Sequence, residues 1–127
     1  MSPPTILVID DQADLRAMIE MTLVSAGFHV VGAANGREAI RAVAKEKIDL
    51  VLTDLLMPER DGLEVMADLR RSRPDLPVIA MSGGGRMPAD FYLKVARTFG
   101  AKTILEKPFS PEQFLEKIGG VLSDKIP

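Results

Sequence analysis

The chain has 127 residues, which is the usual length of one domain, and 46% of them are hydrophobic, as in an average globular protein. Its formal net charge of -2 gives no general electrostatic attraction to nucleic acid or to an anionic membrane, so neither is expected as a partner. The lack of cysteine and the single histidine, His29, exclude a disulfide framework, a thiolate zinc site and a multi-histidine metal cluster.

The N-terminus, Met1-Ser2-Pro3-Pro4, has no basic-then-apolar signal pattern, and no apolar run approaches the ~18 residues of a spanning helix. We therefore expect a soluble, cytoplasmic protein. At this length roughly two thirds of the unfolded chain's surface can be buried, enough for a core without metal or disulfide staples. We expect a single domain over residues 1–127, with its core at about 5–123, and no output domain.

The first predicted strand is the apolar run Ile6–Ile9, which stops abruptly at Asp10 and Asp11, as expected of a strand buried on both faces. A helix follows, because apolar residues recur at helical spacing and Gly27 is suited to a left-handed C-terminal cap. The apolar positions of this helix are Leu15, Met18, Ile19, Leu23 and Ala26. Most of the seven methionines of the chain are expected at core positions.

The same alternation repeats along the middle of the chain. Residues Phe28–Val31 are predicted as the second strand, and Asn35 as the cap of the second helix, with Glu38 three residues later. The third strand, Leu50–Thr53, precedes Asp54. A loop then leads to a third helix, whose apolar positions are Leu63, Met66 and Leu69.

The last part of the chain contains two more strands and two more helices. Residues Pro77–Met81 are predicted as the fourth strand, Pro88–Phe99 as the fourth helix and Thr103–Leu105 as the fifth strand. The last helix is expected to start after Ser110, because a proline follows this serine directly and a glutamine lies three residues on. The residues that flank this cap as a hydrophobic staple are Phe109 and Phe114.

Five strand signals and five helix signals thus alternate strictly. This alternation predicts a parallel sheet covered by helices on both faces, because crossovers between parallel strands are right-handed. In such a sheet ligands bind beyond the carboxyl ends of the strands. The hydrophilic residues expected at that rim are Asp10, Asp11, Asp54, Ser82 and Lys107.

The three aspartates of this rim point to a cation. Two carboxylates about 4 Å apart repel by ~4 kcal/mol at an effective dielectric of about 20, so a cluster of acids is unfavourable alone. Oxygen ligation by carboxylates and water fits Mg²⁺ better than zinc, and such sites typically bind together with a phosphate. Lys107 and the Ser82 hydroxyl suit phosphate oxygens, as a point charge and a hydrogen-bond donor.

Each of these features also has a purely structural interpretation. Asp10 and Asp11 can be a strand stop, with Asp11 as the cap of the following helix, and Asp54 can be a turn residue. Ser82 can belong to a turn, because the three glycines after it lack the Lys-Ser/Thr of a P-loop. Lys107 can belong to a plain strand-to-helix connection. Their occurrence at the ends of four different strands favours a shared site.

Four short motifs are spread over nearly the whole chain. They are Asp10-Asp11, Thr53-Asp54 with Met57-Pro58 and Asp61-Gly62, Met81-Ser82-Gly83, and Lys107-Pro108-Phe109. In this combination the sequence resembles the receiver domain of two-component response regulators, and especially the single-domain chemotaxis receivers. The resemblance implies a flavodoxin-like, doubly wound (βα)5 fold, with five parallel strands in the order 2-1-3-4-5.

The resemblance also implies roles for the acidic residues. Asp54 matches the aspartate that accepts a phosphoryl group from a phosphohistidine of a sensor histidine kinase or a histidine phosphotransfer protein. Asp11 would ligate Mg²⁺ directly and Asp10 mainly through water. The Asp54 carboxylate and the Leu56 backbone carbonyl would complete the protein ligands.

Further roles fall on the last two strands. Ser82 would donate to a phosphoryl oxygen after a shift of its loop, and Lys107 would pair with another oxygen. The resemblance implies a cis peptide bond before Pro108. The sequence departs from the pattern at Ile104, where many receivers carry an aromatic residue that gates the output face. We therefore expect the glycine loop that begins at Gly83 to be the main switching element.

The expected function is that of a stand-alone receiver that is phosphorylated on Asp54 and then changes conformation. It would alter its contacts with an unknown downstream protein or relay the phosphate, and would catalyse only its own phosphorylation and dephosphorylation. The donor must be another protein, because His29 is predicted on a strand. The alternative is a Mg²⁺-dependent phosphohydrolase with an aspartyl nucleophile, which is weaker because such enzymes usually place a second acid where this chain has Leu56.

Overall fold

The computed structural model describes residues 3–54, 62–82, 94, 97–98 and 100–123. Five strands and four helices lie within these residues, and the fourth helix expected from the sequence, over residues 88–99, falls mostly outside them. The described elements are, in chain order, β1 (Thr5–Ile9), α1 (Ala13–Ser25), β2 (His29–Ala33), α2 (Gly36–Lys45), β3 (Leu50–Asp54), α3 (Gly62–Ser72), β4 (Val78–Ser82), β5 (Thr103–Glu106) and α5 (Pro111–Ser123).

All five strands are parallel and form one sheet in the order β2-β1-β3-β4-β5. This order confirms the doubly wound, flavodoxin-like fold expected from the sequence. The direction of winding reverses between β1 and β3, the place where open α/β sheets bind their ligands. The register pairs Ile9 with Thr53, so the residues that follow, Asp10 and Asp54, reach the same edge of the sheet.

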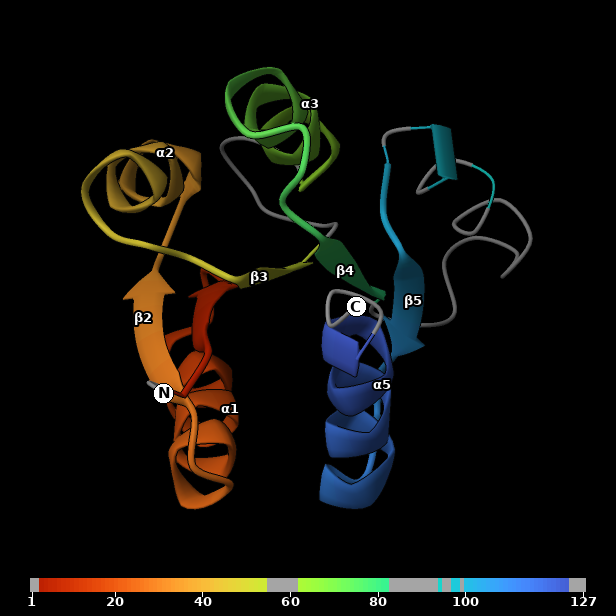
Figure 1. The fold of residues 1–127 in the computed structure, drawn as a ribbon. Helices are drawn as coiled ribbons and strands as arrows, with labels where there is room; N and C mark the ends of the chain where they lie inside the picture. The colour runs from red at the N-terminus through yellow and green to blue at the C-terminus, as the bar shows by residue number, and fades with distance from the viewer. Residues whose placement is uncertain (1–2, 55–61, 83–93, 95–96, 99, 124–127) are drawn as a thin grey trace.

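Helices cover both faces of the sheet (Figure 1). The helices α2 and α3 lie on one face, and α1 and α5 lie on the other. Side chains of a strand alternate between the faces, so in β1 Leu7 and Ile9 pack toward α2 and α3, whereas Ile6 and Val8 pack toward α1 and α5. This explains why the sequence of β1 is continuously apolar: both of its faces are buried.

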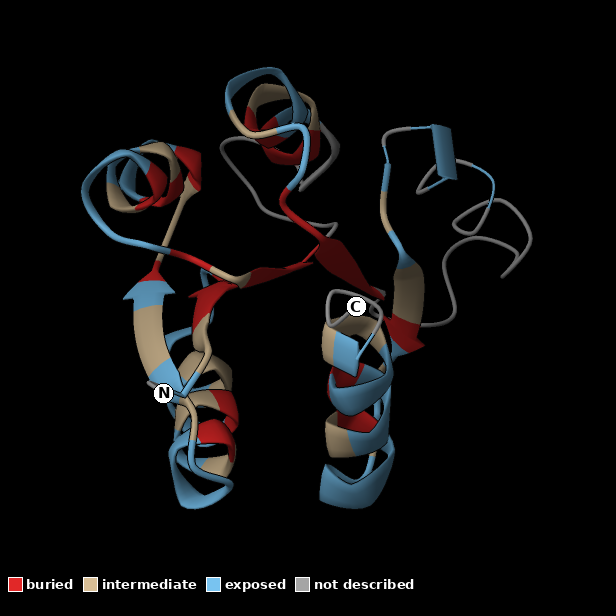
Figure 2. Ribbon diagram, viewed as in Figure 1, coloured by how far each residue is buried: buried red, intermediate tan, exposed pale blue. Residues whose placement is uncertain are grey.

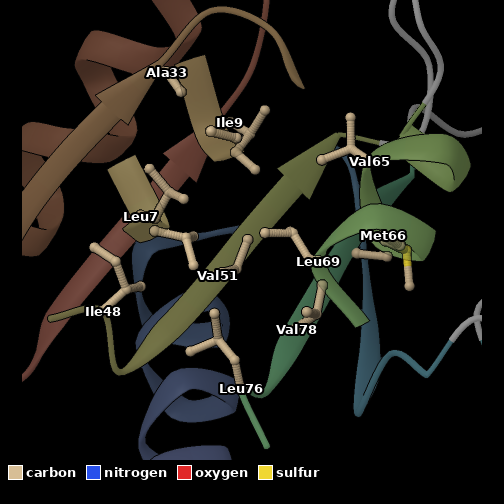
Figure 3. Close-up of a cluster of buried hydrophobic side chains, with 13 residues drawn as sticks. Leu7, Ile9, Ala33, Ile48, Val51, Val65, Met66, Leu69, Leu76 and Val78 are labelled. Atoms are coloured by element: carbon tan, nitrogen blue, oxygen red, sulfur yellow. The ribbon is translucent and has the colours of Figure 1, made fainter. Parts of the chain in front are cut away.

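The central strands form the most buried layer of the molecule (Figure 2). Between this layer and α3, Val65, Met66 and Leu69 pack in one cluster with Val51 and Val78 (Figure 3). Full burial of one such side chain contributes about 1.5–3 kcal/mol. The core therefore holds β1, β3 and β4 firmly, and with them the residues at their carboxyl ends.

Helix ends follow the signals in the sequence. Gly27 has φ 97°, in the left-handed region expected after α1. Asn35 accepts a hydrogen bond from the Glu38 amide over 2.9 Å and so caps α2. Ser110 and Gln113 bond each other's backbone amides over 3.1 and 3.0 Å at the start of α5.

Two expectations about side chains are corrected. The expectation that most methionines lie in the core is wrong for the described residues, because Met66 and Met81 are buried but Met18 and Met21 are 60% and 70% exposed. Met18 was expected on the apolar face of α1. That helix is only half covered by the sheet and buries a narrow stripe that contains Ile19 and Leu23, so Met18 lies outside it.

The strand β2 begins one position later and ends two positions later than predicted from the sequence. It pairs with the whole of β1, with His29 opposite Thr5 and Ala33 opposite Ile9, so the ladder extends beyond the apolar run. His29 is therefore the exposed first residue of the strand and not a mid-strand residue. Within the described residues no helix is both long and apolar enough to cross a membrane.

Candidate functional site

Three charged residues meet at the carboxyl edge of the sheet, each at the end of a strand. Asp10 directly follows β1, Asp54 is the last residue of β3, and Lys107 directly follows β5. The strands β1 and β3, which precede the two aspartates, are buried on both faces, and β5, which precedes Lys107, is held in register by its pairing with β4. The fold therefore places these side chains together although they are far apart in the sequence.

Asp10 is fully buried, and its polar atoms are engaged on all sides. Its amide donates to the Ala33 carbonyl over 3.1 Å, and its Oδ1 atom accepts from the Gln12 amide over 2.9 Å. Its own carbonyl accepts from Arg16 Nη1 over 2.6 Å. A buried charge requires such partners, because its removal from water is otherwise unfavourable by several kcal/mol.

Lys107 connects the two buried aspartates. Its Nζ atom lies 3.2 Å from Asp54 Oδ2 and 3.5 Å from Asp10 Oδ2. The lysine side chain is 17% exposed, and those of Asp54 and Asp10 are 7% and 0% exposed. The cation is thus shared between two carboxylates in a largely desolvated environment, where charges interact more strongly than in water.

Asp11 adds a third carboxylate, and in contrast to the other two it is exposed. One carboxylate oxygen from each of Asp10, Asp11 and Asp54 lies within 4.8 Å of the others, so all three can reach one ion. The single charge of Lys107 does not balance three carboxylates. The site therefore has an all-oxygen donor set and excess negative charge, and both suit a hard divalent cation such as Mg²⁺.

Asp11 is not the cap of α1. The N-cap position is held by Gln12, and its side chain makes no capping hydrogen bond. The structural interpretation of Asp11 as a helix cap is therefore wrong, and its carboxylate is not committed to that role.

Other predicted site residues lie partly or wholly outside what the structure describes. Ser82 ends β4, where its backbone pairs with Glu106 of β5. Leu56 and Gly83 fall outside the described residues. Ile104 of β5 is partly buried and packs against the cluster beneath α2 and α3. The peptide bond between Lys107 and Pro108 is cis, the form implied by the resemblance.

Sequence reasoning missed Arg16. This residue comes six positions after Asp10 and lies in α1, where an arginine is usually a solvated surface residue. Its guanidinium instead donates to the Asp10 carbonyl and lies close to Glu20, with 3.6 Å between Arg16 Nε and Glu20 Oε1. A usable signal was present in the spacing, since Arg16 lies in the first turn of a helix that starts just after the strand end, and helical side chains lean toward the N-terminus of their helix.

Comparison with known proteins agrees with this fold. The chain matches the response regulator receiver domain over residues 6–119. A response regulator receiver domain protein (CheY-like) from Methanospirillum hungatei JF-1 superposes with a TM-score of 0.88 at 26% identity, over 97% of this chain and 96% of that one. Chemotaxis protein CheY4 of Vibrio cholerae gives a TM-score of 0.88 at 29% identity, over 94% and 99%.

Curated relatives are longer than this chain. Transcriptional regulatory protein GlrR of Escherichia coli is 32% identical over 125 residues, which are 98% of this chain and 28% of GlrR. The probable transcriptional regulator ycf27 of Pyropia yezoensis is 37% identical over 123 residues, 95% of this chain and 49% of that protein. The chain thus spans about half, or less, of the length of these relatives.

Proposed function

The chain belongs to the family of response regulator receiver domains, which are phosphoacceptor signalling domains, and from this premise we propose that Asp54 is its phosphorylated residue. The donor in this proposal is a phosphohistidine of a sensor histidine kinase or of a histidine phosphotransfer protein. Mg²⁺ would be held by Asp10, Asp11, Asp54 and the backbone carbonyl of Leu56, which lies outside the described residues.

The observation that carries the proposal is the position of Lys107 beside Asp54. A carboxylate at the end of a buried strand, with an ammonium group 3.2 Å from Oδ2, has a cation ready for the oxygens of an incoming phosphoryl group. Asp10 and Asp11 lie beside the same carboxylate, and one oxygen of each of the three aspartates is within 4.8 Å of the others. A structural ion pair alone would not account for the exposed third carboxylate.

Transfer would proceed by in-line displacement at phosphorus. An oxygen of Asp54 attacks, the new P–O bond forms as the P–N bond to the donor imidazole breaks, and the imidazole nitrogen keeps the electron pair. Positioning and charge neutralisation supply most of the catalysis in such a reaction. When bound, Mg²⁺ would neutralise charge on the phosphoryl oxygens and between the clustered carboxylates.

The chain's own residues set the geometry of this step. The buried strand β3 holds Asp54 at a fixed height, since its side chains pack on both faces of the sheet. The ammonium group of Lys107 would move from the carboxylate of Asp54 to an oxygen of the phosphoryl group. Ser82 would donate to another oxygen, and Gly83, directly after it, would allow the backbone to follow.

The output is proposed to be a change in protein contacts, or relay of the phosphoryl group to a second histidine. Relatives named as transcriptional regulators favour an output that reaches transcription. Ile104 replaces the aromatic gate, so the signal would leave through the segment after Ser82. This role is consistent with the cytoplasmic location expected from the sequence.

The test is phosphorylation with a small phosphodonor and Mg²⁺, followed by intact-mass spectrometry. The wild type should gain one phosphate, and Asp54→Asn should gain none. Glu46→Gln is a matched control, because Glu46 is exposed at the C-terminal end of α2, away from the carboxyl edge of the sheet. This variant should be phosphorylated like the wild type. Phosphate retained on Asp54→Asn would place the acceptor elsewhere.

An assay with an external phosphoester separates the proposal from the phosphohydrolase alternative. A receiver should carry at most one phosphate per chain and should not turn over the phosphoester. Continuous release of phosphate from an external phosphoester, at many turnovers per chain, would instead identify an enzyme.

A further inference from the structure

We propose that Arg16 is a positioning residue for the acidic site, and that Glu20 and Gly32 keep it in place. The inference rests on the proposed Mg²⁺ site of Asp10, Asp11 and Asp54. It concerns a chain of contacts that runs from an exposed position on the edge strand β2, through α1, to the backbone of the acidic pair.

The first contact is the hydrogen bond from Arg16 Nη1 to the carbonyl oxygen of Asp10, over 2.6 Å. This carbonyl belongs to the peptide unit that joins Asp10 to Asp11. Since a peptide unit is planar, its orientation sets the direction in which the chain enters Asp11. Arg16 therefore acts on the exposed carboxylate of Asp11 without touching it.

The remaining polar atoms of Asp10 are held by other groups. Its amide bonds to Ala33 over 3.1 Å, and Oδ1 accepts from the Gln12 amide over 2.9 Å. These bonds fix the residue at the end of β1 but leave its carbonyl to Arg16. A charged donor makes a stronger hydrogen bond than a neutral one, so this contact is a firm restraint on the turn.

Glu20 holds the guanidinium from the other side. Its Oε1 atom lies 3.6 Å from Arg16 Nε, one helical turn further along α1. The order of the two charges, with the cation nearer the N-terminus, is the less favourable one for helix stability. The pair is therefore better explained by where it places the guanidinium than by support of the helix.

Gly32 provides the space for Glu20. The helix α1 packs beside β2 (Figure 1), and a Cβ atom added at Gly32 would collide with Glu20 Oε1 and lie 3.6 Å from Arg16 Cδ. Any larger residue on this exposed position of β2 would displace the Glu20 carboxylate. The lack of a side chain at Gly32 is thus part of the arrangement.

The electrostatic balance supports a positional role. An unpaired arginine close to a cation site would oppose the binding of a divalent ion, whereas an arginine paired with Glu20 adds almost no net charge. Arg16 can then restrain the Asp10 carbonyl without repelling the metal. Removal of Glu20 alone should therefore weaken metal binding through two effects, the loss of the restraint and the gain of an unbalanced positive charge.

The test is a titration of the full chain with MgCl₂, followed by NMR through the amide shifts of Asp10 and Asp11. Arg16→Gln should bind Mg²⁺ about tenfold more weakly, as is typical when a group that orients a metal ligand is lost. Arg16→Lys retains a donor and should recover part of this loss. Arg41→Gln, an exposed arginine of α2 on the other face of the sheet, should bind like the wild type.

A second arm follows the contact chain itself. Gly32→Ala should weaken Mg²⁺ binding in the wild-type background and should have no further effect in the Arg16→Gln background, since both changes act through the same guanidinium. Thermal denaturation without Mg²⁺ should change little in either variant. If Arg16→Gln does not fold, Gly32→Ala and Arg16→Lys provide the same comparison.

The outcomes distinguish this inference from the proposed function. Wild-type affinity in Arg16→Gln, together with loss of binding in Asp11→Asn, would overturn the positioning role and leave the metal site in place. Additive effects of Gly32→Ala and Arg16→Gln would overturn the contact chain. If Mg²⁺ shifts neither amide in the wild type, the metal site and this inference both fail.

Discussion

The Nζ atom of Lys107 lies 3.2 Å from Oδ2 of Asp54, although 53 positions of sequence separate the two residues. Their strands are not neighbours, because β4 lies between β3 and β5. The lysine after β5 therefore reaches past the carboxyl end of β4 to the nearly buried carboxylate at the end of β3. Asp10, on a third strand, shares the same cation at 3.5 Å.

Replacement of Lys107 by methionine should destabilise the protein by about 3–5 kcal/mol, because it leaves two buried carboxylates without their shared cation. Mg²⁺ should stabilise this variant more than the wild type, since a divalent ion among the same carboxylates replaces the lost charge. Urea denaturation with and without Mg²⁺ measures both effects. Lys102→Met, at an exposed position before β5, should show neither.

The exposed carboxylate of Asp11 should matter for metal binding and little for the metal-free fold. At a Mg²⁺ concentration of about 100 times the dissociation constant, the wild type should gain about 2.7 kcal/mol of stability through linkage. Asp11→Asn should lose most of this gain while its stability without Mg²⁺ changes little. Denaturation curves at several Mg²⁺ concentrations check this, and an unchanged gain in the variant would contradict the ligand role.

The core beneath α5 depends on one aromatic side chain. Phe114 is 1% exposed and stacks on Phe109 with 5.3 Å between ring centroids. Phe114→Ala should therefore lower the free energy of unfolding by about 3–5 kcal/mol, the usual loss for a buried aromatic residue. Met21→Ala, at a position that is 70% exposed, should stay within about 0.5 kcal/mol of the wild type in the same chemical denaturation experiment.

The start of α5 should depend on its reciprocal cap. Ser110→Ala removes the acceptor of the Gln113 amide and should destabilise the protein by about 1 kcal/mol. Ser123→Ala serves as the control, because that hydroxyl donates to a carbonyl one turn back at the end of the same helix and caps no amide. Equal losses in both variants would show that the cap contributes nothing specific.

The fold was largely predictable because its signals are local. Each buried strand is a short apolar run, and each parallel strand directs its last residue to one edge of the sheet, so Asp10, Asp54 and Lys107 could be placed together from their positions alone. The capping residues Asn35 and Ser110 were readable for the same reason. Their partners lie within three residues, and the chemistry of the cap does not depend on the rest of the fold.

What sequence reasoning missed depends on how elements pack. Met18 has helical spacing with Leu15, three positions earlier, but only the position of the sheet decides which side of α1 is covered. Arg16 has the composition of a surface residue, and its role depends on the distance between α1 and the end of β1. The sequence of β2 does not reveal why a glycine stands at position 32, because the space that it leaves is filled by Glu20 of α1.

The ion pair of Lys107 also helps to hold the edge strand β5 in the sheet. The strand β5 forms one edge of the sheet, and among the strands that the structure describes it pairs with β4 alone. The lysine just after β5 ties that edge to the central strands by charge, over a width of two strand spacings, roughly 9–10 Å. Loss of the negative charge of Asp54 weakens this ion pair and with it the attachment of β5 to the sheet. The amide protons of Thr103–Glu106 should therefore exchange faster with solvent when Asp54 is neutral, and slower when it is charged again.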